Sequence, residues 1–214
     1  MLEKTLRVTL IIGCKRRLWF WKEGMRGLPP HYVALRGTDL HSMVDRFIYS
    51  GLEKAKRTAY YENLDKFNRF LDWFKRNGMN GRIAKVRRMY SELGFTGEVD
   101  FLVRKSHDIY DLYDVKSGDT KLLSFKSLPL QLGGYIVLLQ EHRYLIDECY
   151  ALLLGEKSGE VEYRVDPDVN GFLDHLEEAR KAMVSVVVPP REKSGLCSFC
   201  SYRDICSEFE AEGI

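Results

Sequence analysis

The sequence predicts a mixed α/β (α+β) fold within a single domain of residues 1–214. Three observations lead to this prediction. Helical patterns fill the first third of the chain, alternating apolar and polar residues dominate its middle, and a further helix precedes a tail that contains cysteines. The length allows one full-sized hydrophobic core. With 45% hydrophobic and 30% charged residues, the composition is that of a soluble globular protein rather than a disordered or fibrous one.

The N-terminal helices are predicted from apolar spacing and from capping residues. Leu10, Cys14 and Leu18 recur at four-residue spacing, and the sequence GLPP ends the helix that they indicate. Later helices are bounded by a polar capping residue and by a glycine. The expected helices span residues 5–22, Thr38 or Asp39 to about Arg57, and Tyr60 to Asn77, the last closed by Gly78.

A strand-rich block is expected next, and after it helix and strand alternate. The block runs from about Arg82 to Lys116. It is followed by a helix over roughly Ser127–His142, by strands at Asp147–Leu154 and up to Val165 around a turn at EKSG, and by a helix over about Asp168–Val184. Two prolines at 189 and 190 separate this helix from the tail. A mixed sheet preceded and followed by helices fits the predicted class.

Positive charge gathers in two segments, although the net charge is only +2. Residues 1–36 contain eight Lys or Arg against two Glu, and the segment RIAKVRR at 82–88 adds four positive charges without an acid. Such clusters can attract a polyanion, but helix faces that meet solvent explain the pattern equally well. No apolar run is long enough to cross a bilayer or to form a signal-peptide core. We therefore expect a cytoplasmic protein without membrane contact.

The stretch GEVDFLVRKSHDIYDLYDVKSG, residues 97–118, is typical of a β-hairpin with RKSHD as its connection. In the first strand, side chains alternate between two faces. One face is expected to hold Val99, Phe101 and Val103, and the opposite face Glu98 and Asp100. The hairpin is therefore predicted to bury one apolar face and to carry carboxylates on the other.

The second strand adds Asp114 and Lys116, which flank Val115 and point the same way. Carboxylates on one face repel each other unless a positive charge lies between them. Mg²⁺ and Mn²⁺ prefer oxygen ligands, and a lysine beside them can hold a phosphate oxygen or activate water for in-line attack on a phosphodiester. The alternative is a surface hairpin whose charges face solvent, because D-x-K is a short pattern.

Two further patterns accompany the hairpin. The sequence RGTDLH places His41 early in a helix, and QLGGYIVLLQ places Gln131 and Tyr135 four residues apart on one helix face. Each pattern alone is weak, because a single histidine is more often structural and Q-x-x-x-Y is a frequent accident.

In this order, the motifs resemble the RecB-like branch of the PD-(D/E)xK nuclease superfamily. The resemblance implies a restriction-endonuclease-like core in which a histidine, two aspartates and a backbone carbonyl hold the metal and a lysine assists catalysis. It also implies that a glutamine and a tyrosine position the DNA strand and the lysine. In this sequence the metal ligands would be His41, Asp100, Asp114 and the carbonyl of Val115, and the other catalytic residues Lys116, Gln131 and Tyr135. The family pattern does not use Glu98.

Five cysteines occur, three of them in the tail. Cys197, Cys200 and Cys206 form C-x2-C-x5-C, which is three ligands of a metal site and suits zinc as well as iron. Cys149 lies in the apolar strand ECYALLL, where a buried thiol is expected. Cys14, among basic and aromatic residues, is the better candidate for a fourth ligand.

This arrangement resembles the CRISPR-associated exonuclease family of RecB-like nucleases, which have a cysteine in a C-x-x-R/K-x-x-W context before the nuclease core and three cysteines after it. The sequence CKRRLW, 14–19, fits that context. The resemblance implies an iron–sulfur cluster, [4Fe–4S] or alternatively [2Fe–2S], that is held where residues 1–30 and 186–214 join beside a core of about 36–185. Cluster nuclearity and oligomeric state stay open.

The resemblance further implies a Mg²⁺- or Mn²⁺-dependent exonuclease that cleaves single-stranded DNA, typically 5′ to 3′, and prepares spacer precursors in CRISPR adaptation with the integrase complex as partner. Lys15, Arg16 and Arg17 are candidate DNA contacts, together with Gln131 and Tyr135. The alternatives are a DNA-binding module with little turnover, a RecB-like repair nuclease outside CRISPR, and a nuclease whose cysteines hold zinc.

Overall fold

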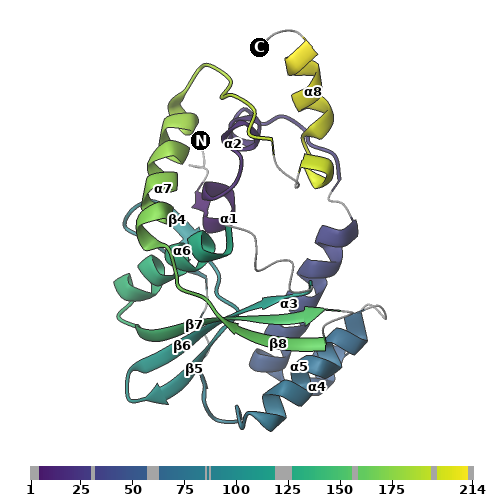
Figure 1. The fold of residues 1–214 in the computed structure, drawn as a ribbon, viewed down its shortest axis with the longest axis vertical. Helices are drawn as coiled ribbons and strands as arrows, with labels where there is room; N and C mark the ends of the chain where they lie inside the picture. Colours follow the sequence, from purple (N-terminus) through teal and green to yellow (C-terminus); the bar gives the residue numbers. More distant parts are fainter. Residues whose placement is uncertain are drawn as a thin grey trace.

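The computed structural model describes residues 5–29, 32–56, 63–84, 86, 88–118, 127–155, 159–193 and 197–211, without the side chains of 32–37. Figure 1 shows a mixed sheet in the lower half of the molecule with helices above and below it, and a second group of helices in the upper half. This arrangement agrees with the predicted mixed α/β class. The division into a core and an iron–sulfur region stays a prediction.

The large sheet has the strand order β2-β5-β6-β7-β8. Its strands are β2 (Ile83–Ala84), β5 (Phe101–Ser106), β6 (Ile109–Lys116), β7 (Leu145–Gly155) and β8 (Gly159–Arg164). Among the described strands of this sheet, β6 and β7 are the one parallel pair. Helix α6 (Ser127–Glu141) lies between them in the chain. A parallel pair needs such a crossover connection, so the helix predicted after the hairpin also explains the sheet order.

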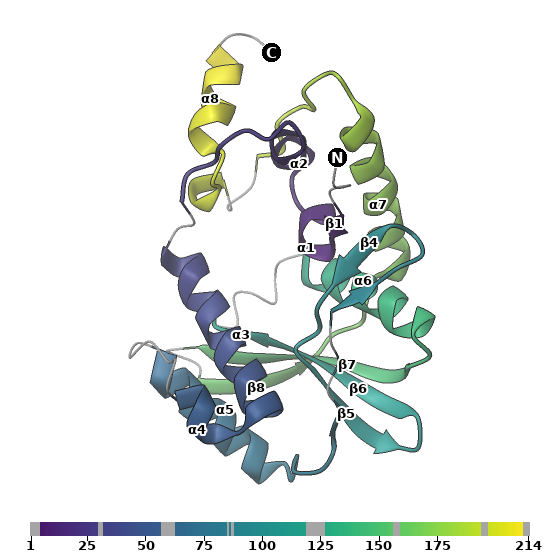
Figure 2. The same ribbon diagram turned by 180° about the vertical axis from the view of Figure 1, so that it is seen from behind.

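A smaller sheet has the order β1-β4-β3. It consists of β1 (Leu6–Arg7), β4 (Phe95–Gly97) and β3 (Met89–Tyr90). Figure 2 shows it beside helix α6, above the large sheet. The parallel pairing of β1 with β4 joins the start of the chain to its middle.

Helices cover both faces of the large sheet (Figures 1 and 2). One hydrophobic core contains side chains of α3, α4 and α5, and the other contains side chains of α6 and α7. The helices are α1 (Val8–Ile11), α2 (Lys15–Lys22), α3 (Tyr32–Ser50), α4 (Leu52–Lys56), α5 (Leu64–Arg76), α7 (Val169–Val184), the 3-10 helix η3 (Cys197–Phe199) and α8 (Arg203–Ala211).

Strand β5 shows how both faces are buried. Phe101 and Val103 belong to the core under α5, whereas Leu102 belongs to the core under α6. Val99, which precedes the strand, lies in the α6 core. The prediction that Val99 shares a face with Phe101 is therefore wrong, because the chain enters the strand only at Phe101.

Helices α6 and α7 approach closely at two glycines. A Cβ atom at Gly134 would lie 2.6 Å from the ring of Phe172, and one at Gly133 would collide with the backbone of Asp168. Asp168 caps α7 by accepting a hydrogen bond from the Gly171 N–H. The GG pair therefore allows the start of α7 to pack on α6, the helix that carries Gln131 and Tyr135.

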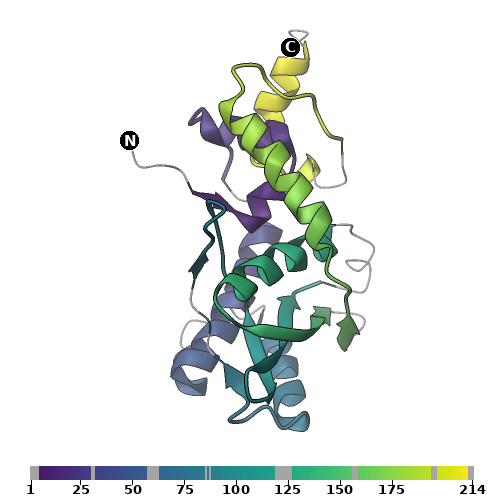
Figure 3. The ribbon, with the colours of Figure 1, turned by 90° about the vertical axis from the view of Figure 1, so that its left-hand side faces the viewer.

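Aromatic side chains join α2 to α8 in the upper half of the molecule. The rings of Phe20 and Phe209 are 5.4 Å apart, those of Phe20 and Tyr202 5.7 Å, and those of Trp19 and Phe209 6.4 Å. Helix α7 runs beside α2 in Figure 3, and Trp19 donates a hydrogen bond to the Ser185 carbonyl at its end. None of the described helices is both long enough and apolar enough to cross a membrane.

The structure corrects several predicted boundaries. Residues 5–22 do not form one helix, because Leu6 and Arg7 pair with β4 and the backbone is extended at Cys14. Helix α3 begins at Tyr32, so Thr38 and Asp39 lie inside it rather than at its cap.

The hairpin connection is also shorter than RKSHD. Strand β5 continues to Ser106 and β6 begins at Ile109, so only His107 and Asp108 remain, the latter with φ of 64°. Aspartate tolerates this left-handed conformation better than most residues. Helix α8 was not expected from the sequence.

Candidate active site

The candidate site lies where β6 ends beside α3 and α6. Asp100, just before β5, accepts a hydrogen bond from the Val115 N–H at 2.6 Å through Oδ2. Its Oδ1 lies 2.7 Å from Nδ1 of His41, which projects from α3. Residues 59 positions apart in the chain therefore meet in one hydrogen-bonded pair.

Asp114 occupies the middle of the site and is almost fully buried. Lys116 Nζ lies 2.7 Å from its Oδ2, close enough for an ion pair. Oδ2 has no further hydrogen-bond partner in the described part of the chain. This oxygen of a buried carboxylate therefore depends on the lysine.

Helix α6 supplies the remaining side chains. Gln131 Oε1 accepts a hydrogen bond from Lys116 Nζ at 3.0 Å. Gln131 Nε2 donates to the Tyr135 hydroxyl at 2.9 Å and to Asp114 Oδ1 at 3.5 Å. The predicted sharing of one helix face by Gln131 and Tyr135 agrees with these contacts, which link both residues to the lysine and the aspartate.

Charge and burial shift the acid–base properties of the site. The negative charge of Asp100 raises the pKa of His41, and burial opposes this shift. Burial favours the protonated form of Asp100, but the charge and hydrogen bond of His41 and the Val115 N–H outweigh it and lower the pKa of Asp100. Burial raises the pKa of Asp114, and Lys116 offsets this only in part. The site therefore places two carboxylates against His41 and Lys116 where water is scarce.

The structure thus brings together His41, Asp100, Asp114, Lys116, Gln131 and Tyr135 through contacts between side chains. Val115 takes part through its N–H, a role that sequence reasoning missed; it follows from the bend that turns Asp100 back towards β6. Their roles in metal binding and catalysis stay predictions.

A cleft of about 430 Å³ opens beside His41 and Asp100. Among the residues that line it are Asp45 and Arg88, neither of which was predicted as a site residue. Asp45 lies four residues after His41 on α3, and this helical spacing was a signal that could have found it. Arg88 is paired with Glu98 at 2.7 Å, and this ion pair is half exposed.

The sequence pattern of the PD-(D/E)XK nuclease superfamily matches residues 62–207, more than half of the chain. The chain belongs to the PD-(D/E)XK nuclease superfamily. A search of curated protein sequences found no match.

Solved structures show the same fold. A protein named SSO0001 is 17% identical, with a TM-score of 0.54 over 97% of this chain and 88% of that chain. A putative exonuclease from Eubacterium rectale is 11% identical, with a TM-score of 0.57 over 90% of this chain and 92% of that chain. At these identities the likeness extends to the fold alone.

Nucleases of this superfamily use divalent metals, and the site fits such an ion. Carboxylate oxygens and an imidazole suit Mg²⁺ or Mn²⁺. Asp114 Oδ2 contacts the Lys116 ammonium group, and because a carboxylate oxygen can serve more than one partner, it can also serve as a ligand of an ion. His41, Asp100 and Asp114 are therefore chemically suited to hold the metal.

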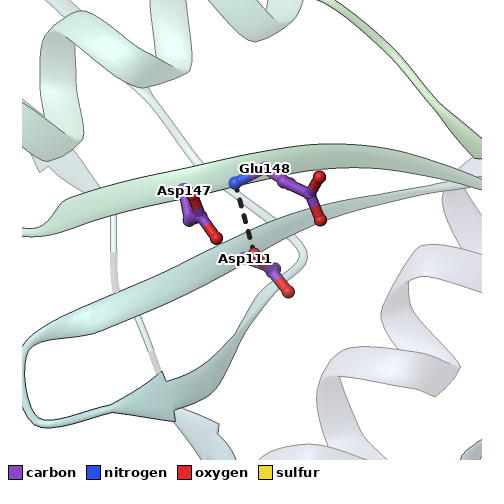
Figure 4. Close-up of side chains that lie close together, drawn as sticks. All are labelled: Asp111, Asp147 and Glu148. Carbon is purple, nitrogen blue, oxygen red and sulfur yellow. Dashed lines mark hydrogen bonds between the residues drawn. The ribbon is translucent and has the colours of Figure 1, made fainter.

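A second acidic group, which the sequence analysis did not single out, lies elsewhere on the large sheet. It consists of Asp111, Asp147 and Glu148 (Figure 4). Lys105 Nζ lies 2.6 Å from Asp147, and 3.6 Å from both Asp111 and Glu148. The ammonium group already supplies the positive charge that these acids need, so their proximity does not require a metal ion.

The four cysteines that the resemblance selects line one cavity of about 220 Å³. Cys14 precedes α2, whereas Cys197, Cys200 and Cys206 lie in and between η3 and α8. Cys149 is separate from them in β7, where burial raises the pKa of its thiol to about 12. The predicted distinction between Cys14 and Cys149 therefore agrees with their positions.

The basic residues beside Cys14 differ from the prediction. Lys15 and Arg16 are buried: Lys15 Nζ bonds to the Ile11 carbonyl and to His175, and Arg16 donates to the Pro189 carbonyl and to Cys206 Sγ. The charged groups of both side chains form contacts inside the protein, so the expectation that they face DNA is wrong. Arg17 alone of the three is exposed.

Proposed function

We propose that this protein is a metal-dependent nuclease that cleaves single-stranded DNA as an exonuclease, with its active site at the end of β6. The observation that carries the proposal is the contact of the buried Asp114 with Lys116, next to the hydrogen-bonded pair of His41 and Asp100. Membership of the nuclease superfamily supports the reaction class. The exonuclease mode is supported by the fold shared with a putative exonuclease.

We assign Mg²⁺ or Mn²⁺ to His41, Asp100, Asp114 and the carbonyl of Val115. When bound, such an ion polarises the phosphoryl group and lowers the pKa of water. The His41–Asp100 hydrogen bond and the Val115 N–H orient these side chains before an ion arrives. Burial of Asp114 and partial burial of Asp100 limit their movement and keep the ligand geometry fixed.

Lys116 is the proposed catalytic cation. Its ammonium group lies beside Asp114, where the scissile phosphate would approach, and there it stabilises the negative charge that develops during attack by water. Gln131 holds the ammonium group through its Oε1, and the Tyr135 hydroxyl fixes the Gln131 amide. These two residues thus position Lys116 and, by the same polar groups, the DNA strand.

We assign an iron–sulfur cluster to Cys14, Cys197, Cys200 and Cys206, which line one cavity. The choice of a cluster over zinc rests on the resemblance of this cysteine set to the CRISPR-associated exonucleases. Arg16 donates a hydrogen bond to Cys206 Sγ at 3.9 Å and so places a positive charge beside this proposed ligand.

A finer assignment rests on the resemblance of CKRRLW and the cysteine trio to CRISPR-associated exonucleases. By that resemblance we propose 5′ to 3′ polarity, a cytoplasmic location, and a role in preparing spacer precursors for the CRISPR integrase complex. A RecB-like repair nuclease outside CRISPR would share the site chemistry.

The test uses single-stranded DNA labelled at either end, with Mn²⁺ or with EDTA. The parent is expected to digest it only with Mn²⁺, and the position of the label reports polarity. Asp114→Asn and Lys116→Ala are expected to abolish digestion. Asp111→Asn is the matched control, because Asp111 is a buried carboxylate on the same strand that belongs to the Lys105 group.

The outcomes separate the candidate functions. Loss of digestion in Asp111→Asn but not in Asp114→Asn would move the active site to the second acidic group. A folded parent that binds DNA but digests none with Mn²⁺ would instead identify a DNA-binding module.

A further inference from the structure

We propose that the DNA strand reaches the active site along a groove over the small sheet, held by Arg7, Arg17 and Arg88 and by the rings of Tyr90 and Trp21. This inference rests on the proposed function and assigns the substrate path of the same site. Of these residues, Arg17 is among the candidate DNA contacts named from the sequence, and Arg7 and Arg88 belong to the two basic segments noted there.

The floor of the groove is one face of the small sheet. Arg7 pairs with Thr96, and Thr96 pairs with Tyr90, so the three residues form one row across the strands and project to the same side. On the other side, Leu6 and Phe95 are buried in the core. Arg7 is exposed, and Tyr90 is exposed at 61% of its surface.

Three hollows adjoin one another along this floor. The outer one, about 510 Å³, is lined by Arg7, Arg17, Trp21, Tyr90 and others. The middle one, about 160 Å³, shares Arg7 and Arg88 with it and reaches Tyr135. The inner one, about 430 Å³, shares Arg88 and Glu98 with the middle one and reaches His41 and Asp100. Arg88 lines all three, so the hollows follow one another past its side chain.

The chemistry of the groove suits a single strand. Arg17 and Trp21 are four residues apart on α2 and share a face, so the outer end presents a guanidinium group next to an indole ring. Arg7 and Arg88 continue the positive charge inward, and Glu98 pairs with Arg88 at the inner end. Proteins that bind single strands combine a basic groove with aromatic rings on which bases stack, and guanidinium groups hold phosphates well.

The proposed path also has a direction relative to the chemistry. A strand that lies over Tyr90 and Arg7 passes Arg88 before it meets Asp100 and Asp114. Long strands therefore use the whole groove, whereas a dinucleotide occupies only the catalytic end. Substitutions at the outer end should therefore lower the rate of cleavage more for a long strand than for a short one.

The experiment compares Arg7→Gln and Tyr90→Ala with two control variants, Lys75→Ala on α5 and Tyr163→Ala on β8. Lys75 and Tyr163 are exposed but do not line the groove. Binding is measured in EDTA by fluorescence anisotropy with a labelled single strand of about 30 nucleotides, longer than the ~4–16 nucleotides that one OB fold covers. Cleavage with Mn²⁺ is measured on this strand and on a dinucleotide. Thermal melting confirms that each variant is folded.

Tyr90→Ala is expected to weaken binding of the long strand about fivefold or more, the loss of one stacked base. Arg7→Gln is expected to lower the slope of log affinity against log salt by about 0.7, the loss of one phosphate contact. In both variants the rate of cleavage should fall further on the long strand than on the dinucleotide. Lys75→Ala and Tyr163→Ala should match the parent.

If the parent protein cleaves DNA and the groove variants behave like the controls, the proposed groove is wrong and the nuclease assignment stands. A parent that binds through Arg7 and Tyr90 but never cleaves supports the groove and refutes the nuclease assignment. Equal losses on both substrates also overturn the groove, because they indicate a general distortion of the site.

Discussion

Replacement of Cys14 by serine tests the proposed cluster and its structural role together. Cys14 and Cys197 are 183 residues apart in the sequence, so a shared cluster closes nearly the whole chain into a loop. By analogy with a disulfide, closing a loop of this length removes on the order of 5 kcal/mol of chain entropy from the unfolded state. Cys14→Ser is therefore expected to lower the free energy of unfolding by as much as this.

Other contacts between the two ends survive the substitution. The ring contacts of Phe20 with Tyr202 and Phe209 still join α2 to the α8 region, and aromatic pairs contribute about 0.5–1.5 kcal/mol each beyond the area that they bury. We therefore expect the two ends of the chain to stay associated in folded Cys14→Ser.

Cys149→Ala is the matched control, because it removes a buried thiol that lies outside the cavity. Its expected cost is about 1 kcal/mol, the usual size of a core truncation, and its iron content should equal that of the parent. Each protein is purified anaerobically. Its iron content per chain, its absorbance near ~400 nm from iron–thiolate bonds and its midpoint of unfolding in denaturant are then measured. Full iron content and an unchanged midpoint in Cys14→Ser would refute the reasoning, and a colourless parent that contains zinc would refute the cluster alone.

Three further predictions follow from contacts in the core and the site. Gln131→Leu removes the acceptor that holds Lys116 and one of the proposed DNA contacts, so kcat for single-stranded DNA should fall at least tenfold and by a larger factor than strand affinity in EDTA; an equal fall in both would argue against a role in positioning the lysine. Gly134→Ala forces a methyl group against the Phe172 ring, and overpacking of this kind costs about 1–3 kcal/mol; in denaturant unfolding, Phe172→Leu in the same chain should recover part of that loss, and strict additivity would contradict the contact. Phe70→Ala empties a fully buried position between α5 and the sheet and should cost about 3–5 kcal/mol in unfolding free energy, whereas a loss below 1 kcal/mol would contradict the packing of α5.

Short-range patterns determined much of the candidate site. The D-x-K pattern on β6 and the Q-x-x-x-Y pattern on α6 follow from the two-residue period of a strand and the near-four-residue period of a helix. These periods set which side chains share a face before any tertiary contact forms. The helices α6 and α7, the strands β6 and β7, and the relation of Gln131 to Tyr135 could all be predicted in this way.

The faces of the hairpin were predicted less well. A strand covered by helices on both sides has no polar face, and the alternation around Val99 resembles a half-exposed strand only because the chain bends before Phe101. Local sequence does not record which faces other elements will cover, so the second core under α5 came from packing alone.

The sequence by itself determined the local patterns of the hairpin and of α6, and the chemistry that the site residues could perform. Only the tertiary structure decided that His41 meets Asp100, that Arg7 and Tyr90 lie in one row across the small sheet, and that Lys15 and Arg16 are turned inward. Each of these contacts joins segments far apart in the chain. Their formation depends on how whole elements pack, because local backbone geometry constrains only near neighbours whereas burial of apolar surface selects the global arrangement.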